Sequence, residues 1–354
     1  MSGGIAVLYQ LAARLRELGR EVVLAGADDA PGLAAQAAAG FAVVSWNSVM
    51  GKNGAPFLRE GDLFLISEGW PNMMAPALAA KARVVVYAQS WIYINTALPE
   101  GAAWNRLPVS FLAVSHPVAR FLEDMAHIAP SGVIRPVIDP ARFRPQPLTG
   151  GKTIRIAWMS RKNKALAEQI MQITGGMDQD GMDQGGMDQA ASPSNRPTGK
   201  SPTGRSRVEW VEIRNMTPDE VAKTLASCHI FLSTGFPEGC PLPPLEAMAS
   251  GCLVVGFTGY GGWDYMRQAS PGQYAPRIAL RPVPWGGNGL YAPDGDVLEA
   301  SFLLHAAITM VRENAPEYAG IREQAMLTAT AYSIDAQRED VRAAWDMLEN
   351  SPHG

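Results

Sequence analysis

The first half of the chain alternates short runs of apolar residues with amphipathic stretches. Residues 5–19 carry leucines at helical spacing and end at Gly19, which predicts a helix over this range. The continuous Val, Ile and Leu runs that follow are typical of strands buried on both faces, and segments of helical pattern separate them. This order predicts a parallel sheet covered by helices. Its strands are expected at 21–26, 41–46, 62–67, 83–88, 110–115 and 132–137.

A second α/β pattern begins at residue 153, after a linker rich in proline and arginine. The last amphipathic stretch, 333–349, begins at Ser333, and serine is favoured at the N-cap of a helix. The pattern predicts an N-terminal domain over 1–148, a second domain over 149–332 and a closing helical segment over 333–354. In the second domain, strands are expected at 153–159, 208–213, 229–234 and 253–257, and helices at 217–227, 244–250, 295–312 and 319–330.

Residues 175–206 interrupt the second pattern. The segment GGMDQDGMDQGGMDQ at 175–189 repeats a five-residue unit and leads into a stretch rich in Ser, Pro and Gly. Apart from its methionines it has almost no apolar side chains, so burial cannot offset the entropy lost on ordering. We expect a disordered insertion between a helix and a strand, and no metal site within it.

Composition and charge narrow the class of protein. A chain of 354 residues fits two domains of about 150 residues each, and its 47% of hydrophobic residues is enough for two cores. With 30 basic and 34 acidic residues, the formal net charge of −4 argues against a nucleic-acid-binding protein. The three cysteines form no C-x-x-C pair, which suits a reducing compartment. No apolar run reaches the roughly 18 residues of a membrane span and no signal-peptide pattern is present, so we expect a soluble cytoplasmic protein.

Several short motifs fail on inspection. The GGKT sequence at 150–153 lacks the earlier glycine of a phosphate-binding loop, because that position is Gln146. The GKS sequence at 199–201 fails in the same way at Ser194. No G-x-S-x-G nucleophile motif is present. The five histidines show no metal-ligand spacing, so we expect neither a metal nor a cofactor.

The most informative stretch of the sequence is 229–262. A predicted buried strand ends at Thr234 and leads through a Gly/Pro-rich loop into a helix that starts near Pro244. In open α/β sheets, phosphorylated ligands bind where the carboxyl end of a parallel strand meets the N-terminus of a helix. Two carboxylates, Glu238 and Glu246, stand here with the spacing E-x7-E.

These two carboxylates suit recognition of a sugar rather than of a phosphate. An ionised carboxylate accepts two hydrogen bonds from a vicinal diol, which ribose and hexose both offer. The backbone N–H groups of Gly239, Cys240 and Leu242 are available to face a diphosphate. For either glutamate alone, solvation or the helix dipole explains the residue as well, but the whole string favours a ligand site.

The string FPEGCPLPPLEAMASGCLVVGFTGYGG resembles the donor-site signature of glycosyltransferase family four, retaining enzymes of the GT-B fold. The usual form of that signature is close to EGFGLPPLEAMA followed by a glycine-rich GGxxE/D segment. The resemblance covers residues 229–264 strongly and the remaining α/β halves in outline. It implies an α/β protein with two Rossmann-like domains whose parallel sheets face across a cleft. It also implies transfer of a hexose from a nucleotide diphosphate sugar to a hydroxyl acceptor, on a glycan, a lipid-linked glycan or a small molecule, with retention of anomeric configuration.

The resemblance assigns roles to the residues of this string. Glu238 would face the donor hexose, and Glu246 would hold the ribose of the nucleotide. Backbone atoms of four residues between them would line the sugar and the diphosphate: Gly239, Cys240, Pro241 and Leu242.

The resemblance also implies an arginine and a lysine after the first strand of the second domain. The sequence WMSRKNK offers Arg161, with Lys162 or Lys164, on the loop after 153–159. Two positive charges there would neutralise the departing diphosphate, so no metal is expected. The family spaces this pair more widely, so both lysines stay candidates. Arg161 and Lys164 join Glu238 as expected catalytic residues, and Lys162 is expected to bind the donor.

In the first domain the resemblance points to the Gly3-Gly4 pair and to Gln89. The glycine pair, with Gly4 closest, would approach the donor phosphates, and Gln89 ends a strand comparable to the one that carries an acceptor-side histidine in many members. The closing segment 333–354 resembles the helix that crosses back to the first domain. In the family a strand precedes the glycine pair, whereas this sequence starts at Met1-Ser2. We therefore expect the first strand of the N-terminal domain to be missing, through a misassigned start codon or a truncation.

Other functions stay open at this point. A degenerate, non-catalytic member of the same fold would bind nucleotide or glycan without transfer, and a missing strand favours it. A nucleotide-sugar epimerase would keep the fold, although the E-x7-E string resembles the transferase signature. Three arginines of the first helix, Arg14, Arg16 and Arg20, leave open a peripheral membrane contact, but the nearly neutral first half favours an ordinary solvated face. The sequence determines neither the base and sugar of the donor nor the acceptor.

Overall fold

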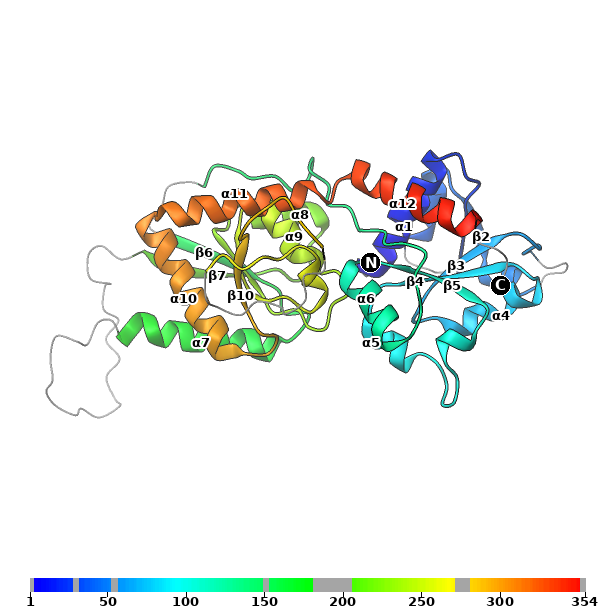
Figure 1. Cartoon of the computed structure of the whole chain (residues 1–354). Helices are drawn as coiled ribbons and strands as arrows, with labels where there is room; N and C mark the ends of the chain where they lie inside the picture. The colour runs from blue at the N-terminus through cyan, green and yellow to red at the C-terminus, as the bar shows by residue number, and fades with distance from the viewer. Residues whose placement is uncertain are drawn as a thin grey trace, which may run out of the picture. The chain divides into compact units, whose positions relative to one another are not determined.

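The computed structural model describes residues 3–27, 32–51, 57–148, 153–180, 206–270 and 281–350. The chain forms two compact units (Figure 1). The first contains Met1–Val137, Pro237–Leu242 and Tyr332–Gly354, and the second contains Ile138–Phe236 and Pro243–Ala331. The loop Pro237–Leu242, which carries Glu238, therefore belongs to the first unit, whereas Glu246 belongs to the second.

Two parallel sheets form the strand framework of the first unit. Strand β4 (Arg83–Ala88) lies between β3 (Leu63–Ser67) and β5 (Val109–Ala113), and its residues from Val84 onward are almost completely buried. Strand β1 (Val23–Gly26) pairs with β2 (Ala42–Ser45) in a separate sheet. These five strands confirm five of the predicted ranges. Among the described residues no ladder joins the two sheets. The absence of a first strand ahead of the first helix stays a prediction.

The strand predicted at 132–137 is wrong. Only an isolated parallel bridge, between Val133 and Ala113, forms there in the described part of the chain. The backbone N–H of Arg135 donates to the Asp340 carboxylate, and its carbonyl accepts from the Gln337 side chain. Pro136 has no N–H to donate. The N–H of Ile134 still donates to the Ala113 carbonyl, but beyond it Pro136 offers no donor and the backbone groups of Arg135 and Val137 are bonded to side chains of the last and first helices, so the ladder ends.

The helices of the first unit enclose one apolar core around β4. Helix α1 packs against the last helix, α12, and the ion pair Arg338–Glu17 joins them. Arg20, three residues after the end of α1, pairs with Glu349 of α12. Helix α6 begins at a serine cap, because the Ser115 side chain accepts from the Val118 N–H. The helices are α1 (Gly3–Glu17), α2 (Leu33–Ala38), α3 (Trp46–Val49), α4 (Ala75–Ala79), α5 (Trp91–Thr96), α6 (His116–Met125) and α12 (Ile334–Asn350), with 3-10 turns η1 (Pro71–Met74) and η2 (Trp104–Arg106).

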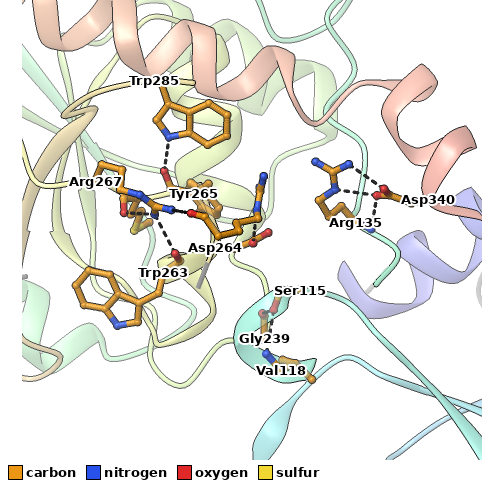
Figure 2. Close-up of polar contacts among 12 residues, drawn as sticks. Ser115, Val118, Arg135, Gly239, Trp263, Asp264, Tyr265, Arg267, Trp285 and Asp340 are labelled. Atoms are coloured by element: carbon orange, nitrogen blue, oxygen red, sulfur yellow. Dashed lines mark hydrogen bonds and ion pairs between the residues drawn. The ribbon is translucent and has the colours of Figure 1, made fainter. Parts of the chain in front are cut away.

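A two-pronged ion pair holds α12 on the rest of the first unit (Figure 2). Two guanidinium nitrogens of Arg135 lie 2.8 Å from the two carboxylate oxygens of Asp340, and both side chains are largely buried, at 17% and 16% exposed. Charge-assisted bonds in this paired geometry are among the stronger hydrogen bonds in proteins.

Replacing Asp340 with alanine is expected to destabilise the protein, because it leaves the Arg135 guanidinium and backbone N–H without their shared acceptor. The expected loss is about 1–3 kcal/mol of unfolding free energy. Urea unfolding measures it, with Asp346→Ala on the exposed side of the same helix as the control. Equal midpoints for the two variants would show that the pair contributes nothing.

The second unit is built on one parallel sheet of five strands. Its order is β10-β9-β8-β6-β7, so β9, β8 and β6 each have a neighbouring strand on both edges. Every residue of β8 and β9 is buried. The four predicted strands are confirmed. Strand β10 was not predicted, because it is a four-residue run after glycines. The strands are β6 (Thr153–Trp158), β7 (Arg207–Glu212), β8 (Ile230–Ser233), β9 (Leu253–Phe257) and β10 (Gly289–Ala292).

The helices of the second unit follow the predicted pattern with one correction. Helix α7 packs against α10 and does not end at the glycine pair 175–176. It continues through Asp180, six residues into the segment predicted to be disordered. Residues 181–205 of that segment lie outside the described residues. The helices are α7 (Lys164–Asp180), α8 (Pro218–Ala226), α9 (Leu242–Ala249), α10 (Val297–Glu313) and α11 (Pro316–Thr330), with the 3-10 turn η3 (Gly261–Asp264). Across the described residues of both units, we find no helix long and apolar enough to span a membrane.

Candidate functional site

In the second unit, the loops that follow β6 and β8 are joined by one side chain. The Asn163 amide donates to the carbonyls of Thr234 and Phe236, at 2.9 Å each. Since β6 and β8 are parallel neighbours, their carboxyl ends lie at the same edge of the sheet. The bonds from Asn163 therefore fix the loop that carries Arg161 beside the segment that leads from β8 to α9.

Glu246 lies at this edge, in the first turns of α9. Burial raises the pKa of its carboxyl from 4.5 to about 7, and the positive charges of Arg142 and Arg161 lower the pKa in part. Burial outweighs the two guanidinium groups because a carboxylate loses its hydration when it leaves water. The side chain is therefore poised to ionise near neutral pH, and a polar ligand could replace its lost hydration.

The sequence analysis missed Arg142. It stands in a turn in which the N–H groups of Arg142 and Phe143 bond to the Asp139 carbonyl, close enough for its charge to act on Glu246. The sequence signal is an arginine directly after the Asp139-Pro140 turn. Its distance of more than a hundred residues from Glu246 hides the relation until the chain is folded.

The two candidate lysines differ in their surroundings. Lys164 is the first residue of α7. Its ammonium group lies 3.4 Å from the carboxylate of Glu168, one turn along the same helix. Both of these side chains are about half exposed. Lys162 lies on the loop before Asn163 and is partly buried. Burial raises the pKa of Glu246, and the neighbouring Arg161 lowers it in part through its positive charge.

In the first unit, the loop Pro237–Leu242 rests on the carboxyl edge of the β3-β4-β5 sheet. The Ser115 hydroxyl, after β5, donates to the Gly239 carbonyl at 2.5 Å (Figure 2). A Cβ atom added to Gly239 would lie 1.8 Å from the Gln89 carbonyl oxygen, so only glycine fits. A Cβ on Gly4 would lie 2.7 Å from the Gln89 side-chain oxygen. The structure thus brings together Gly4, Gln89 and Gly239.

Glu68 is a second residue that the sequence analysis missed. It follows β3, is 1% exposed, and accepts hydrogen bonds from the Gln89 N–H at 3.0 Å and the Ser67 hydroxyl at 2.9 Å. Burial raises the pKa of Glu68, and these hydrogen bonds lower it in part. The carboxyl group therefore fixes the backbone of Gln89 against Gly239. A glutamate directly after a buried strand was the available signal.

The remaining residues of the loop are packed rather than open. Pro241 is buried, and Cys240 and Leu242 are partly buried against the core of the first unit. Glu238 is partly exposed. The environment of Cys240 therefore suits a small packing residue.

The glycine-rich segment after β9 is held by ion pairs and backbone bonds of the second unit. Asp264, which ends it, is fully buried, and the Arg281 guanidinium lies 2.9 Å from its carboxylate. Asp294 accepts the Gly259 N–H at 2.8 Å. The Arg267 guanidinium donates to the Trp263 carbonyl at 3.0 Å. These contacts fix the turn as a structural element beside the edge that carries Glu246.

Comparisons with known proteins agree with this architecture. No protein-family model matches the chain. A segment of 53 residues, 15% of this chain, is 49% identical to an α-1,6-glucosyltransferase of Actinobacillus pleuropneumoniae serotype 7 (strain AP76), of which it covers 16%. Sucrose-phosphate synthase from Thermosynechococcus elongatus superposes over 98% of this chain and 94% of its own, with a TM-score of 0.59 and 12% identity.

Two further solved structures are similar over most of this chain. TarM of S. aureus gives a TM-score of 0.51 with 14% identity, covering 81% of this chain and 55% of TarM. The pneumococcal O-GlcNAc transferase GtfA gives 0.50 with 13% identity, covering 83% of this chain and 58% of GtfA. The chain thus spans little more than half of these two proteins and a sixth of the curated glucosyltransferase.

The chain has the GT-B fold, an α/β architecture with parallel sheets in two domains. The predicted fold class is therefore confirmed, and these structural neighbours agree with the resemblance found in the sequence.

Proposed function

We propose that the chain is a glycosyltransferase that moves a hexose from a nucleotide diphosphate sugar to a hydroxyl acceptor with retention of anomeric configuration. The observation that carries the proposal is the placement of Glu246 in α9 at the carboxyl edge of the second sheet, where the bonds of Asn163 fix the loop that carries Arg161. This edge is where open α/β sheets bind nucleotides. The structures of TarM and GtfA were both determined in complex with UDP, which supports a nucleotide donor.

The residues divide the work of transfer among them. Glu246 accepts hydrogen bonds from the ribose diol, and Arg161 with Lys162 or Lys164 neutralises the diphosphate as its bond to the anomeric carbon breaks. Glu238 faces the hexose. Backbone atoms of Gly239, Cys240, Pro241 and Leu242, together with Gly4, line the sugar and the diphosphate. Gln89 stands on the acceptor side.

Because side chains neutralise the leaving group in this scheme, transfer is expected to continue in the presence of EDTA. Among the described residues, no three His, Cys, Asp or Glu side chains gather as a metal-ligand set. The measurement compares initial rates with and without EDTA after dialysis. Loss of activity that Mg²⁺ or Mn²⁺ restores would contradict the assignment of this role to the basic side chains.

Binding of the donor is expected to strengthen as the pH rises. With a pKa of about 7, Glu246 goes from about one tenth to about nine tenths ionised between about pH 6 and pH 8, so affinity that needs the carboxylate rises up to about tenfold. Calorimetry with a nucleotide sugar at several pH values measures this. In Glu246→Gln the slope should disappear; the same slope in both proteins would assign the titration to another group.

A thermal-shift screen of UDP, GDP, ADP and dTDP tests the proposed function. We expect one nucleotide to raise the melting temperature of the wild-type chain. That nucleotide would also identify the base of the donor. If none of the four shifts it at millimolar concentration, the chain has no working donor site and the proposal fails.

A further inference from the structure

A cavity lies in the second unit, lined by residues other than those assigned to the donor. It has a volume of about 730 Å³ and runs between the segment 141–148 and helix α8, reaching Thr153 at the start of β6 and His229 just before β8. The donor residues follow the opposite, carboxyl ends of β6 and β8. None of Arg161, Lys162, Lys164 and Glu246 lines it.

The charges that line this cavity are mostly positive. The lining contains four basic side chains and one carboxylate, although the whole chain has a net charge of −4. The basic residues are Arg142, Arg144, Arg155 and Lys223, and the acidic residue is Asp219. His229 adds no charge at neutral pH, because burial and the nearby Arg322 and Arg155 lower its pKa. Such a concentration of cations on an acidic protein is the electrostatic pattern of an anion site.

Two of the four cations are already bonded to other groups. The Arg142 guanidinium lies 2.8 Å from the Asp219 carboxylate. A guanidinium nitrogen of Arg155 donates to the Ser227 hydroxyl at 2.8 Å, and another lies 3.5 Å from Glu209. The part-buried bond to Ser227 holds the Arg155 head group at the wall of the cavity before a ligand arrives, whereas the exposed pair with Asp219 leaves Arg142 free to exchange its partner for a ligand.

The other two cations, Arg144 and Lys223, keep their donors available. Among the described residues, neither forms a hydrogen bond or an ion pair with another side chain. Both are exposed, so a ligand can reach them from solvent. Guanidinium and ammonium groups together bind phosphate oxygens through short, charge-assisted hydrogen bonds.

We propose that this cavity is a binding site for an organic phosphate or pyrophosphate of about nucleotide size, separate from the donor site. The volume lies within the range of about 300–1,000 Å³ that is typical of small-molecule sites. Arg144 and Lys223 provide the contacts to phosphate, and Arg142 and Arg155 provide the positive wall. The proposal does not depend on the function proposed above.

Calorimetry with inorganic pyrophosphate tests this site in the full chain. The double variant Arg144→Ala/Lys223→Ala removes the two available cations and is expected to weaken pyrophosphate binding by about tenfold or more. The control Arg59→Ala/Arg106→Ala removes the same charge from exposed positions of the first unit and should bind within about twofold of the wild type. Circular dichroism melting of each variant shows that it is folded, since neither pair has bonds to lose.

Pyrophosphate can also reach the donor site, so Arg161→Ala is measured in parallel. Binding that survives in Arg161→Ala and is lost in Arg144→Ala/Lys223→Ala supports the second site. Binding lost only in Arg161→Ala would place the anion at the donor site and overturn the proposal. If the charge-matched control weakens pyrophosphate binding equally, the binding reflects general electrostatic attraction and the proposal is overturned. The absence of pyrophosphate binding to the wild type would also overturn it.

Discussion

Replacing Glu246 with alanine is expected to weaken nucleotide binding about 10- to 100-fold, because it removes the acceptor of two charge-assisted hydrogen bonds from the ribose. Calorimetric titration with the nucleotide found by thermal shift measures the change. The matched control is Glu317→Ala, which removes an exposed carboxylate from α11 of the same unit and should leave affinity unchanged. Equal affinities for Glu246→Ala and the wild type would remove Glu246 from the donor site.

The fold should survive this substitution. The pKa of Glu246 is raised in the folded state, so its carboxyl opposes folding increasingly as the pH rises from about 4.5 to about 7. Removing it therefore should not lower the stability at neutral pH. We therefore expect Glu246→Ala to have a melting temperature no lower than that of the wild type and a weaker affinity for the nucleotide. This combination is typical of a functional residue that lowers stability.

Replacing Gly239 with alanine is expected to lower the rate of transfer by about 100-fold, a loss that a displacement of about 1 Å near the reacting atoms can cause. The added Cβ atom would lie 1.8 Å from the Gln89 carbonyl oxygen and 2.7 Å from its carbon, so the loop that carries Glu238 must move. Both contacts are with backbone, which cannot rotate away as the end of a side chain can.

Two other variants control this experiment. Gly320→Ala, on α11, adds a Cβ where no other atom lies within 4 Å, and it should leave the rate unchanged. Ser115→Ala adds no volume but removes both the hydrogen bond to the Gly239 carbonyl and the cap of α6, and it should cause a smaller loss of rate. If Gly239→Ala transfers sugar at the wild-type rate, the loop Pro237–Leu242 does not hold the donor.

The parts of the fold that could be predicted are those with a local cause. Apolar runs such as 83–88 and 253–257 mark strands buried on both faces, and the structure has β4 and β9 there. Periodicity failed at 132–137, where the ladder to β5 ends before Pro136, which has no N–H. Side chains far away in the sequence, Asp340, Gln337 and Gln10, take the backbone groups of Arg135 and Val137. No local pattern encodes that competition.

The candidate site divides in the same way. The E-x7-E string could be found because its residues are close in sequence, and the resemblance it carried also pointed to Gly4 and Gln89, which the structure places together with Gly239. Glu68 and Arg142 were missed because their importance comes only from contact or charge acting across distant segments. Which turns of parallel strands touch one another is a property of the folded chain.

Transfer of labelled hexose tests the central claim most directly. The full chain is incubated with nucleotide sugars labelled in the hexose, with and without a mixture of hydroxyl acceptors, and both donor and products are analysed. We expect a labelled glycoside to form only when an acceptor is present. Its rate of formation should be far lower with Glu246→Ala than with the wild type. Conversion of the sugar without an acceptor would indicate an epimerase, and nucleotide binding without any turnover would indicate a non-catalytic binding protein; either result contradicts the proposed glycosyltransferase.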